Sequence, residues 1–213
     1  MKTKHYQFFF ATLFITFSTC FSAKGQLYWR TDYGVGMAFI ASEQANNNLG
    51  ISGGGLAVPL RLTFSHESWR FGKNLYPAIG LEADLLFAGA SDNHYFGLSF
   101  ELEMPQNEIG GRYDAEFYFR ASGGRVIHFL NLSGYGGKPL PRDMVNTSNK
   151  PYLNLGMGLR SAFNPNDKLK IGFFIELGAM FNKASYVPAV TENMTHIYVK
   201  LGLYLFEGIK SGL

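Results

Sequence analysis

The chain has 213 residues and a formal net charge of +3, and 16% of its residues are charged and 16% are aromatic. This length suits one domain plus a targeting segment, and so many aromatic residues with so little net charge exclude an intrinsically disordered chain. The excess charge lies in Lys2, Lys4 and Lys24, because the 19 basic residues minus these three leave 16, which equals the 16 acidic residues. From residue 26 onward the chain is therefore neutral, which excludes a basic surface for nucleic acid.

Residues 1–25 have the pattern of a secretory signal peptide. Lys2 and Lys4 form a basic start, residues 8–19 are mostly apolar, and Ala23-Lys24-Gly25 places small residues at positions −3 and −1. We therefore expect export by the Sec route and cleavage before Gln26. The apolar stretch is shorter than the about 20 residues that a transmembrane helix needs.

The only cysteine of the chain, Cys20, lies inside this segment. The mature chain is therefore expected to contain neither a disulfide nor a reactive thiol. In the alternative, Cys20 would be the lipid-bearing residue of a lipoprotein, but Phe17-Ser18-Thr19 matches the required cleavage box poorly.

After the signal peptide, apolar and polar residues alternate in eight segments, which is typical of strands with one apolar and one polar face. In the last segment Ile197, Val199 and Leu201 alternate with Tyr198 and Lys200. In chain order the predicted strands cover residues 27–41, 51–65, 77–87, 94–103, 112–122, 152–162, 169–181 and 195–206. Their lengths are close to the about 9–11 residues that a tilted strand needs to cross a bilayer.

The polar faces of these segments combine glycines with charges of both signs. In a narrow barrel lumen, opposite charges can pair and glycines leave room for long side chains. The predicted lumen charge network consists of Arg30, Asp32, Arg61, Glu82, Asp84, Glu101, Glu103, Glu116, Arg120, Arg160, Lys170, Glu176 and Lys200. Aromatic residues gather near the segment ends, where the aromatic girdles of membrane barrels lie.

We therefore predict an all-β fold: an eight-stranded antiparallel up-and-down transmembrane β-barrel. The barrel covers residues 26–206, after a signal peptide at 1–25 and before a short tail at 207–213. A soluble β-sandwich is the alternative, since its strands also have one apolar face. Eight strands enclose an interior that side chains fill, which argues against a water-filled pore.

With the N-terminus on the periplasmic side, the longest outward loop covers residues 123–151. Within it, residues 125–132 are apolar enough for a strand extension, a short lid helix or a contact patch. The candidate binding residues of this loop are Val126, Ile127, Phe129 and Tyr135.

A predicted periplasmic turn holds a second candidate set, Trp69, Arg70 and Phe71. Tryptophan and arginine dominate the energetics of protein interfaces, so this set suits the docking of a protein partner. Anchoring of the turn in lipid headgroups explains the same residues and is the favoured interpretation.

Three segments carry a resemblance to a known group of proteins. Tyr33-Gly34-Val35-Gly36, Val58-Pro59-Leu60-Arg61-Leu62 and the terminal strand through Phe206 resemble small outer-membrane β-barrels, in particular the OmpX/OmpA-like and PorT-like eight-stranded group. The resemblance covers nearly the whole mature chain and is architectural. It implies an outer-membrane location in a Gram-negative-type envelope, lipid as a partner, and a role in binding, adhesion or assembly. The chain departs from the group in continuing beyond Phe206, where such barrels usually end on an aromatic residue.

The histidines leave one enzymatic alternative. Some eight-stranded barrels modify lipid A with a histidine, a serine and an acid near the outer rim, and Ser91-Asp92-Asn93-His94 falls in a predicted outward loop. His128 with Ser122 or Ser133 is a second arrangement. Because proximity in sequence is a poor guide to active-site geometry, we predict a non-catalytic protein. No histidines are spaced as metal ligands and no glycine pair precedes a helix, so neither a metal nor a cofactor is expected.

Overall fold

The computed structural model describes nine stretches of the chain: residues 26–41, 54–66, 68–71, 75–88, 91–106, 115–130, 147–163, 169–187 and 190–210. The predicted signal peptide, Cys20, the starts of the second and fifth predicted strands (51–53 and 112–114) and Tyr135 lie outside them. Among the residues described, none forms a helix with the length and hydropathy needed to span a bilayer.

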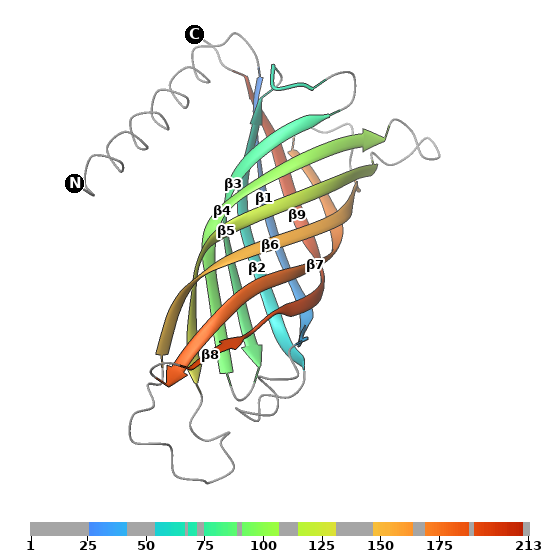
Figure 1. Ribbon diagram of the computed structural model, residues 1–213. Coiled ribbons are helices and arrows are strands. Elements are labelled where there is room, and N and C mark those ends of the chain that lie inside the picture. The colour runs from blue at the N-terminus through green and yellow to red at the C-terminus, as the bar shows by residue number, and fades with distance from the viewer. Residues whose placement is uncertain are drawn as a thin grey trace, which may run out of the picture.

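The described residues form long antiparallel strands that close into a barrel (Figure 1). The strands are β1 (Gln26–Ile40), β2 (Gly54–His66), β3 (Tyr76–Ala88), β4 (Ser91–Gln106), β5 (Ala115–Leu130), β6 (Thr147–Ala162), β7 (Leu169–Val187), β8 (Val190–Asn193) and β9 (His196–Lys210). β1 pairs with both β2 and β9, and the β6–β7 and β7–β9 pairings complete the ring. The predicted eight-stranded antiparallel barrel is thus confirmed. β8 is a four-residue strand that pairs with the end of β7 outside the ring.

Several strands are longer than predicted. β5 continues past residue 122 to Leu130, so of the three readings of residues 125–132 the strand extension is correct through Leu130. β9 also continues beyond the predicted end at Phe206 to Lys210, and Lys210 pairs with Gln26. A main-chain ladder needs a partner along the whole of β1, whatever side chains that partner carries.

The barrel wall has the reverse of a soluble protein's distribution of polar and apolar side chains. Lys200 is fully buried in the lumen, whereas the next residue, Leu201, is 55% exposed on the outside. Every strand of the ring contributes outward apolar side chains that are 44–58% exposed, among them Met37, Leu56, Leu81, Leu98, Phe119, Leu153, Leu177 and Leu203. The polar and apolar faces therefore lie as the alternation predicted.

Glycines on the lumen face make room for tyrosines. A Cβ atom placed on Gly158 would lie 2.5 Å from the ring of Tyr118, and one on Gly156 would lie 2.6 Å from the hydroxyl of Tyr198. Both tyrosines are fully buried. The narrow lumen therefore accepts these large side chains only because the facing wall lacks side chains at these positions.

Replacing Gly158 with alanine is expected to destabilise the barrel. The added methyl group must displace Tyr118 or the backbone of β7, and overpacking of this kind costs about 1–3 kcal/mol. The measurement is the urea midpoint of unfolding, followed by the mobility of unheated protein on a denaturing gel. Gly123→Ala is the matched control, since its Cβ meets only a backbone oxygen at 3.3 Å. Equal midpoints for the two variants would contradict the packing argument.

Candidate functional site

The lumen end at which β1 begins, called here the entry rim, holds a cluster centred on Arg30. Its guanidinium donates to Asp32 at 3.1 Å and also pairs with Glu101 and Glu103. All four side chains are buried. The acids come from both β1 and β4, so the cluster holds opposite walls of the barrel together.

Arg160 on β6 extends this cluster across the lumen. It donates to Glu101 at 2.7 Å and to Glu116 at 2.8 Å, and its guanidinium lies 3.6 Å from the ring centroid of Tyr118. The side chain of Glu116 is 25% exposed, whereas that of its partner Arg160 is buried. The entry rim is thus the end at which the network approaches solvent.

Glu176 on β7 is the centre of the middle layer. Its carboxylate accepts two hydrogen bonds from Arg61, at 2.7 and 3.0 Å, and a third from Arg120 at 2.6 Å. The hydroxyl of Tyr118 donates a fourth at 2.9 Å. A single fully buried carboxylate therefore bridges and positions two arginines, Arg61 from β2 and Arg120 from β5.

Two further pairs continue the network away from the entry rim. Arg120 donates to Glu82 at 2.9 Å, and Lys200 donates to Asp84 at 2.8 Å. Lys200 also lies 3.8 Å from the ring centroid of Tyr198. Twelve of the predicted lumen residues occur in the ion pairs of these layers. Lys170 is half-buried near the start of β7 and is not without a partner.

Hydroxyl and amide groups that were not predicted as members of this network complete it. Tyr152 donates to Glu82 at 2.7 Å, and Tyr198 donates to Asn154 at 3.0 Å. The alternation could have identified them, since each of these residues occupies a lumen-facing position of its strand. With these partners, side chains fill the described lumen through its middle layers.

Beyond the ionic layers, towards the end opposite the entry rim, called here the far rim, the lumen contains aromatic and amide side chains. The hydroxyl of Tyr95 lies 3.1 Å from Nδ1 of His196 and accepts a hydrogen bond of 3.1 Å from Asn182. Tyr152 packs edge-on against Tyr95 at 5.1 Å between ring centroids. Together with Val126 these side chains close the lumen near the far rim.

The two histidines of the enzymatic alternative lie on opposite faces of the wall. His94 faces outward between the rings of Phe87 and Phe129, and its Nε2 has no hydrogen-bond partner among the described residues. His128 is fully buried in the lumen, where it contacts the side chain of Asn93 and the carbonyl of Lys183. The structure therefore does not bring these histidines together at one site.

The candidate binding residues on β5 are divided between the same two faces. Val126 is fully buried inside the lumen, whereas Phe129 is 38% exposed on the outside and Ile127 is half-buried there. They form no single contact patch, because successive residues of a strand point to opposite sides. Tyr135 lies outside the described residues.

The other candidate set lies at the entry rim between β2 and β3. Phe71 is 59% exposed and its backbone pairs with Leu75, Arg70 lies 5.6 Å from the ring centroid of Tyr76, and Trp69 is half-buried. The indole packs near the ring of His66 at 6.2 Å. These three residues thus form a small aromatic and cationic surface beside the wall.

Metal binding finds no support in the described stretches, where no group of three His, Cys, Asp or Glu side chains is arranged to hold an ion. The acids of the lumen face arginines and Lys200 instead. The chemistry of the lumen is therefore charge compensation.

Replacing Glu176 with glutamine should destabilise the barrel strongly, because two buried arginines lose their shared carboxylate. Breaking a buried ion pair from one side costs about 3–5 kcal/mol. Glu116→Gln is the matched control. Because its partner Arg160 keeps Glu101, and because the site is partly exposed, the expected cost is below about 1 kcal/mol. Urea unfolding followed by gel mobility measures both, and a smaller loss for Glu176→Gln than for Glu116→Gln would refute the central role of Glu176.

Comparison with known proteins finds similarity of architecture. No protein-family model matches the chain, and no curated protein matches its sequence. Among solved structures it is similar to neisserial surface protein A (15% identity, covering 84% of this chain and 96% of that one, TM-score 0.46). It is also similar to the outer-membrane protein AlkL (11%, 89% and 92%, TM-score 0.47) and to Ail of Yersinia pestis (12%, 86% and 99%, TM-score 0.39). Identities and TM-scores this low carry no information about what this chain binds or does.

Proposed function

We propose that the mature chain is an outer-membrane β-barrel that works without catalysis, as a membrane-anchored component for binding, adhesion or envelope assembly. Its outward loops or its periplasmic turns would contact the partner. One observation carries this proposal: the barrel wall exposes leucines and buries charged side chains, as Leu201 and Lys200 do at neighbouring positions. Such a wall is stable where its surroundings are apolar.

Aromatic side chains near both rims support the same placement. Phe39, Phe87 and Phe129 are 38–46% exposed near the far rim, and Phe71 and Phe163 are 55–59% exposed near the entry rim. Aromatic rings favour the two interfaces of a bilayer. Trp69 and Phe71 then have a simple role as an anchor of the entry rim, in addition to the proposed role in docking.

The filled lumen favours a binding or assembly role over transport through the barrel. Arg61, Arg120 and Glu176 meet near its centre, and all three are buried by facing side chains. Moving a solute through this layer would separate several buried ion pairs, each at a cost of several kcal/mol. The described residues available to a partner are those of the rims and the outer wall.

Catalysis on lipid A by His94 or His128 is the second candidate, and the geometry gives it less support. His94 is packed between two phenylalanines, and His128 contributes to lumen packing. A nucleophilic site needs a base within reach of a serine and oriented by a third group. Alanine variants at both positions should leave the lipid A mass spectrum unchanged, and a changed spectrum in either variant would favour the enzyme.

Membrane fractionation tests the location. The protein should sediment with outer membranes, and unheated samples should migrate differently from boiled ones on a denaturing gel, because a hydrogen-bonded barrel resists detergent until heated. The intact mass of the extracted protein should correspond to a chain that begins at Gln26. Recovery in the aqueous fraction with the same mobility before and after boiling would refute the membrane location.

A further inference from the structure

Within the described strands, the ring is open near the far rim between β6 and β7. The last main-chain pair between β6 and β7 is Tyr152 with Asn182. From there β6 continues to Thr147 paired with β5, whereas β7 continues to Val187 paired with β8. The two strands of the seam therefore separate, as the lower part of Figure 1 shows.

Side chains replace the missing ladder across this seam. Ser148 on β6 accepts a hydrogen bond of 3.0 Å from the backbone N–H of Ser185, and the carbonyl of Lys183 lies 3.2 Å from Nε2 of His128. Pro151, which directly precedes the residues of β6 that pair with β7, has no N–H to donate. The opening is thus supported by specific contacts.

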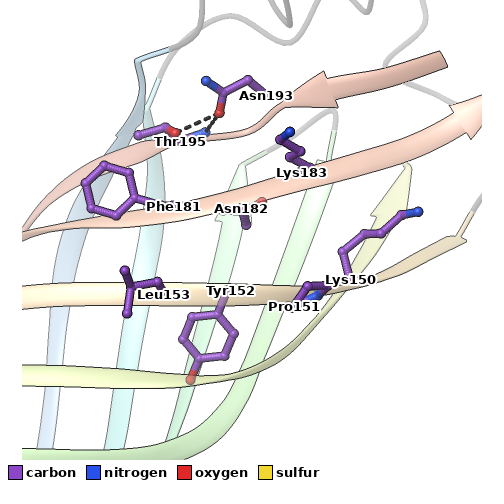
Figure 2. Close-up of a pocket in the computed structure, with 9 residues that line it drawn as sticks. All are labelled: Lys150, Pro151, Tyr152, Leu153, Phe181, Asn182, Lys183, Asn193 and Thr195. Carbon is purple, nitrogen blue, oxygen red and sulfur yellow. Dashed lines mark hydrogen bonds between the residues drawn. The ribbon is translucent and has the colours of Figure 1, made fainter.

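A groove of about 700 Å³ lies at this opening (Figure 2). Its walls come from β6, β7 and the segment that joins β8 to β9. The lining residues are Lys150, Pro151, Tyr152, Leu153, Phe181, Asn182, Lys183, Asn193 and Thr195. Because the groove passes between two strands, it is lined by residues of both wall faces: Leu153 and Phe181 are exposed on the outside, and Tyr152 and Asn182 are buried inside.

The groove combines three kinds of chemistry. Leu153 and Phe181, 49% and 44% exposed, continue the apolar outer wall into it. Lys150 and Lys183 supply two positive charges, and neither pairs with a carboxylate among the described residues.

Asn182 adds the third kind, an unused hydrogen-bond acceptor. Its side chain is 94% buried, since 6% is exposed, and its Nδ2 donates to Tyr95 and to the carbonyl of Met194. Its Oδ1 has no partner in the described part of the chain. A buried acceptor without a donor costs about 1–3 kcal/mol, so a ligand that supplies a donor binds favourably here.

We propose that this groove binds an anionic, acylated glycolipid of the lipid A class. An acyl chain would lie against Leu153 and Phe181, the phosphate groups would contact Lys150 on β6 and Lys183 on β7, and a sugar hydroxyl or acyl-amide N–H would donate to Asn182. The inference rests on the proposed function together with the expected periplasmic N-terminus, which places the entry rim at the periplasm and the far rim at the outer leaflet. An ester-linked phospholipid carries its hydrogen-bond donors only in the headgroup beyond the phosphate, whereas the sugar of the glycolipid carries donors between the phosphate and the acyl chain. The position of Asn182 beside Leu153 and Phe181 therefore favours the glycolipid.

Native mass spectrometry of the full mature barrel, extracted from outer membranes in mild detergent, tests this inference. The probes are purified lipid A, its dephosphorylated form and phosphatidylglycerol. Lipid A should form a one-to-one complex, and binding of the dephosphorylated form should be at least about tenfold weaker, because it loses the charge-assisted contacts to the lysines. Lys150→Gln/Lys183→Gln should weaken lipid A binding by at least about tenfold as well.

Lys170→Gln is the matched control, since Lys170 lies near the entry rim, and it should bind lipid A as the unmodified protein does. The inference is overturned if the double variant retains lipid A, or if phosphatidylglycerol binds as tightly. Fractionation and heat-dependent mobility, measured on the same preparations, report the proposed function separately. If the protein fractionates with outer membranes and shows heat-dependent mobility but binds no lipid A, the glycolipid site is refuted and the membrane location still stands.

Discussion

The closed ladder of main-chain hydrogen bonds is the constraint on which the rest of this protein depends. Closing β1 onto β9 leaves no strand edge along most of the wall, so backbone groups are paired even where apolar side chains surround them. Each strand must then present alternate residues to two different environments. This is why Lys200 and Leu201 can be neighbours, one fully buried and the other 55% exposed.

Closure of so small a ring creates the problem that the lumen network solves. Charged side chains placed inside lose water, and such burial is tolerated only when each charge has close partners. Glu176 meets this requirement for Arg61 and Arg120 together. The volume must also fit, and Gly158 provides space for Tyr118, which bonds to the same carboxylate. Charge compensation and packing are therefore one requirement here, met by residues from distant parts of the chain.

The sequence was informative wherever side-chain parity decides the outcome. It predicted eight strands and placed Arg61 and Glu176 on lumen faces, although it gave no means of pairing residues 115 positions apart. It left the continuation of β5 open among three readings, because Gly123 and Gly124 resemble the start of a loop, while the ladder with β6 continues through them. The seam could not be predicted from the sequence either. It exists because β7 pairs with β8 beyond Asn182 and no longer with β6.

That separation and the charge of the lumen act together on any anionic ligand. Among the described residues, the lumen ion pairs contain seven carboxylates and five cations, Arg30, Arg61, Arg120, Arg160 and Lys200. An anion therefore gains nothing by moving deeper, whereas Lys150 and Lys183 attract it at the seam. Leu153 and Phe181 of the apolar outer wall lie in the same groove, where they can contact the acyl chains of such a ligand. The fold thus directs an anionic lipid to the one described place where the ring of strands is open.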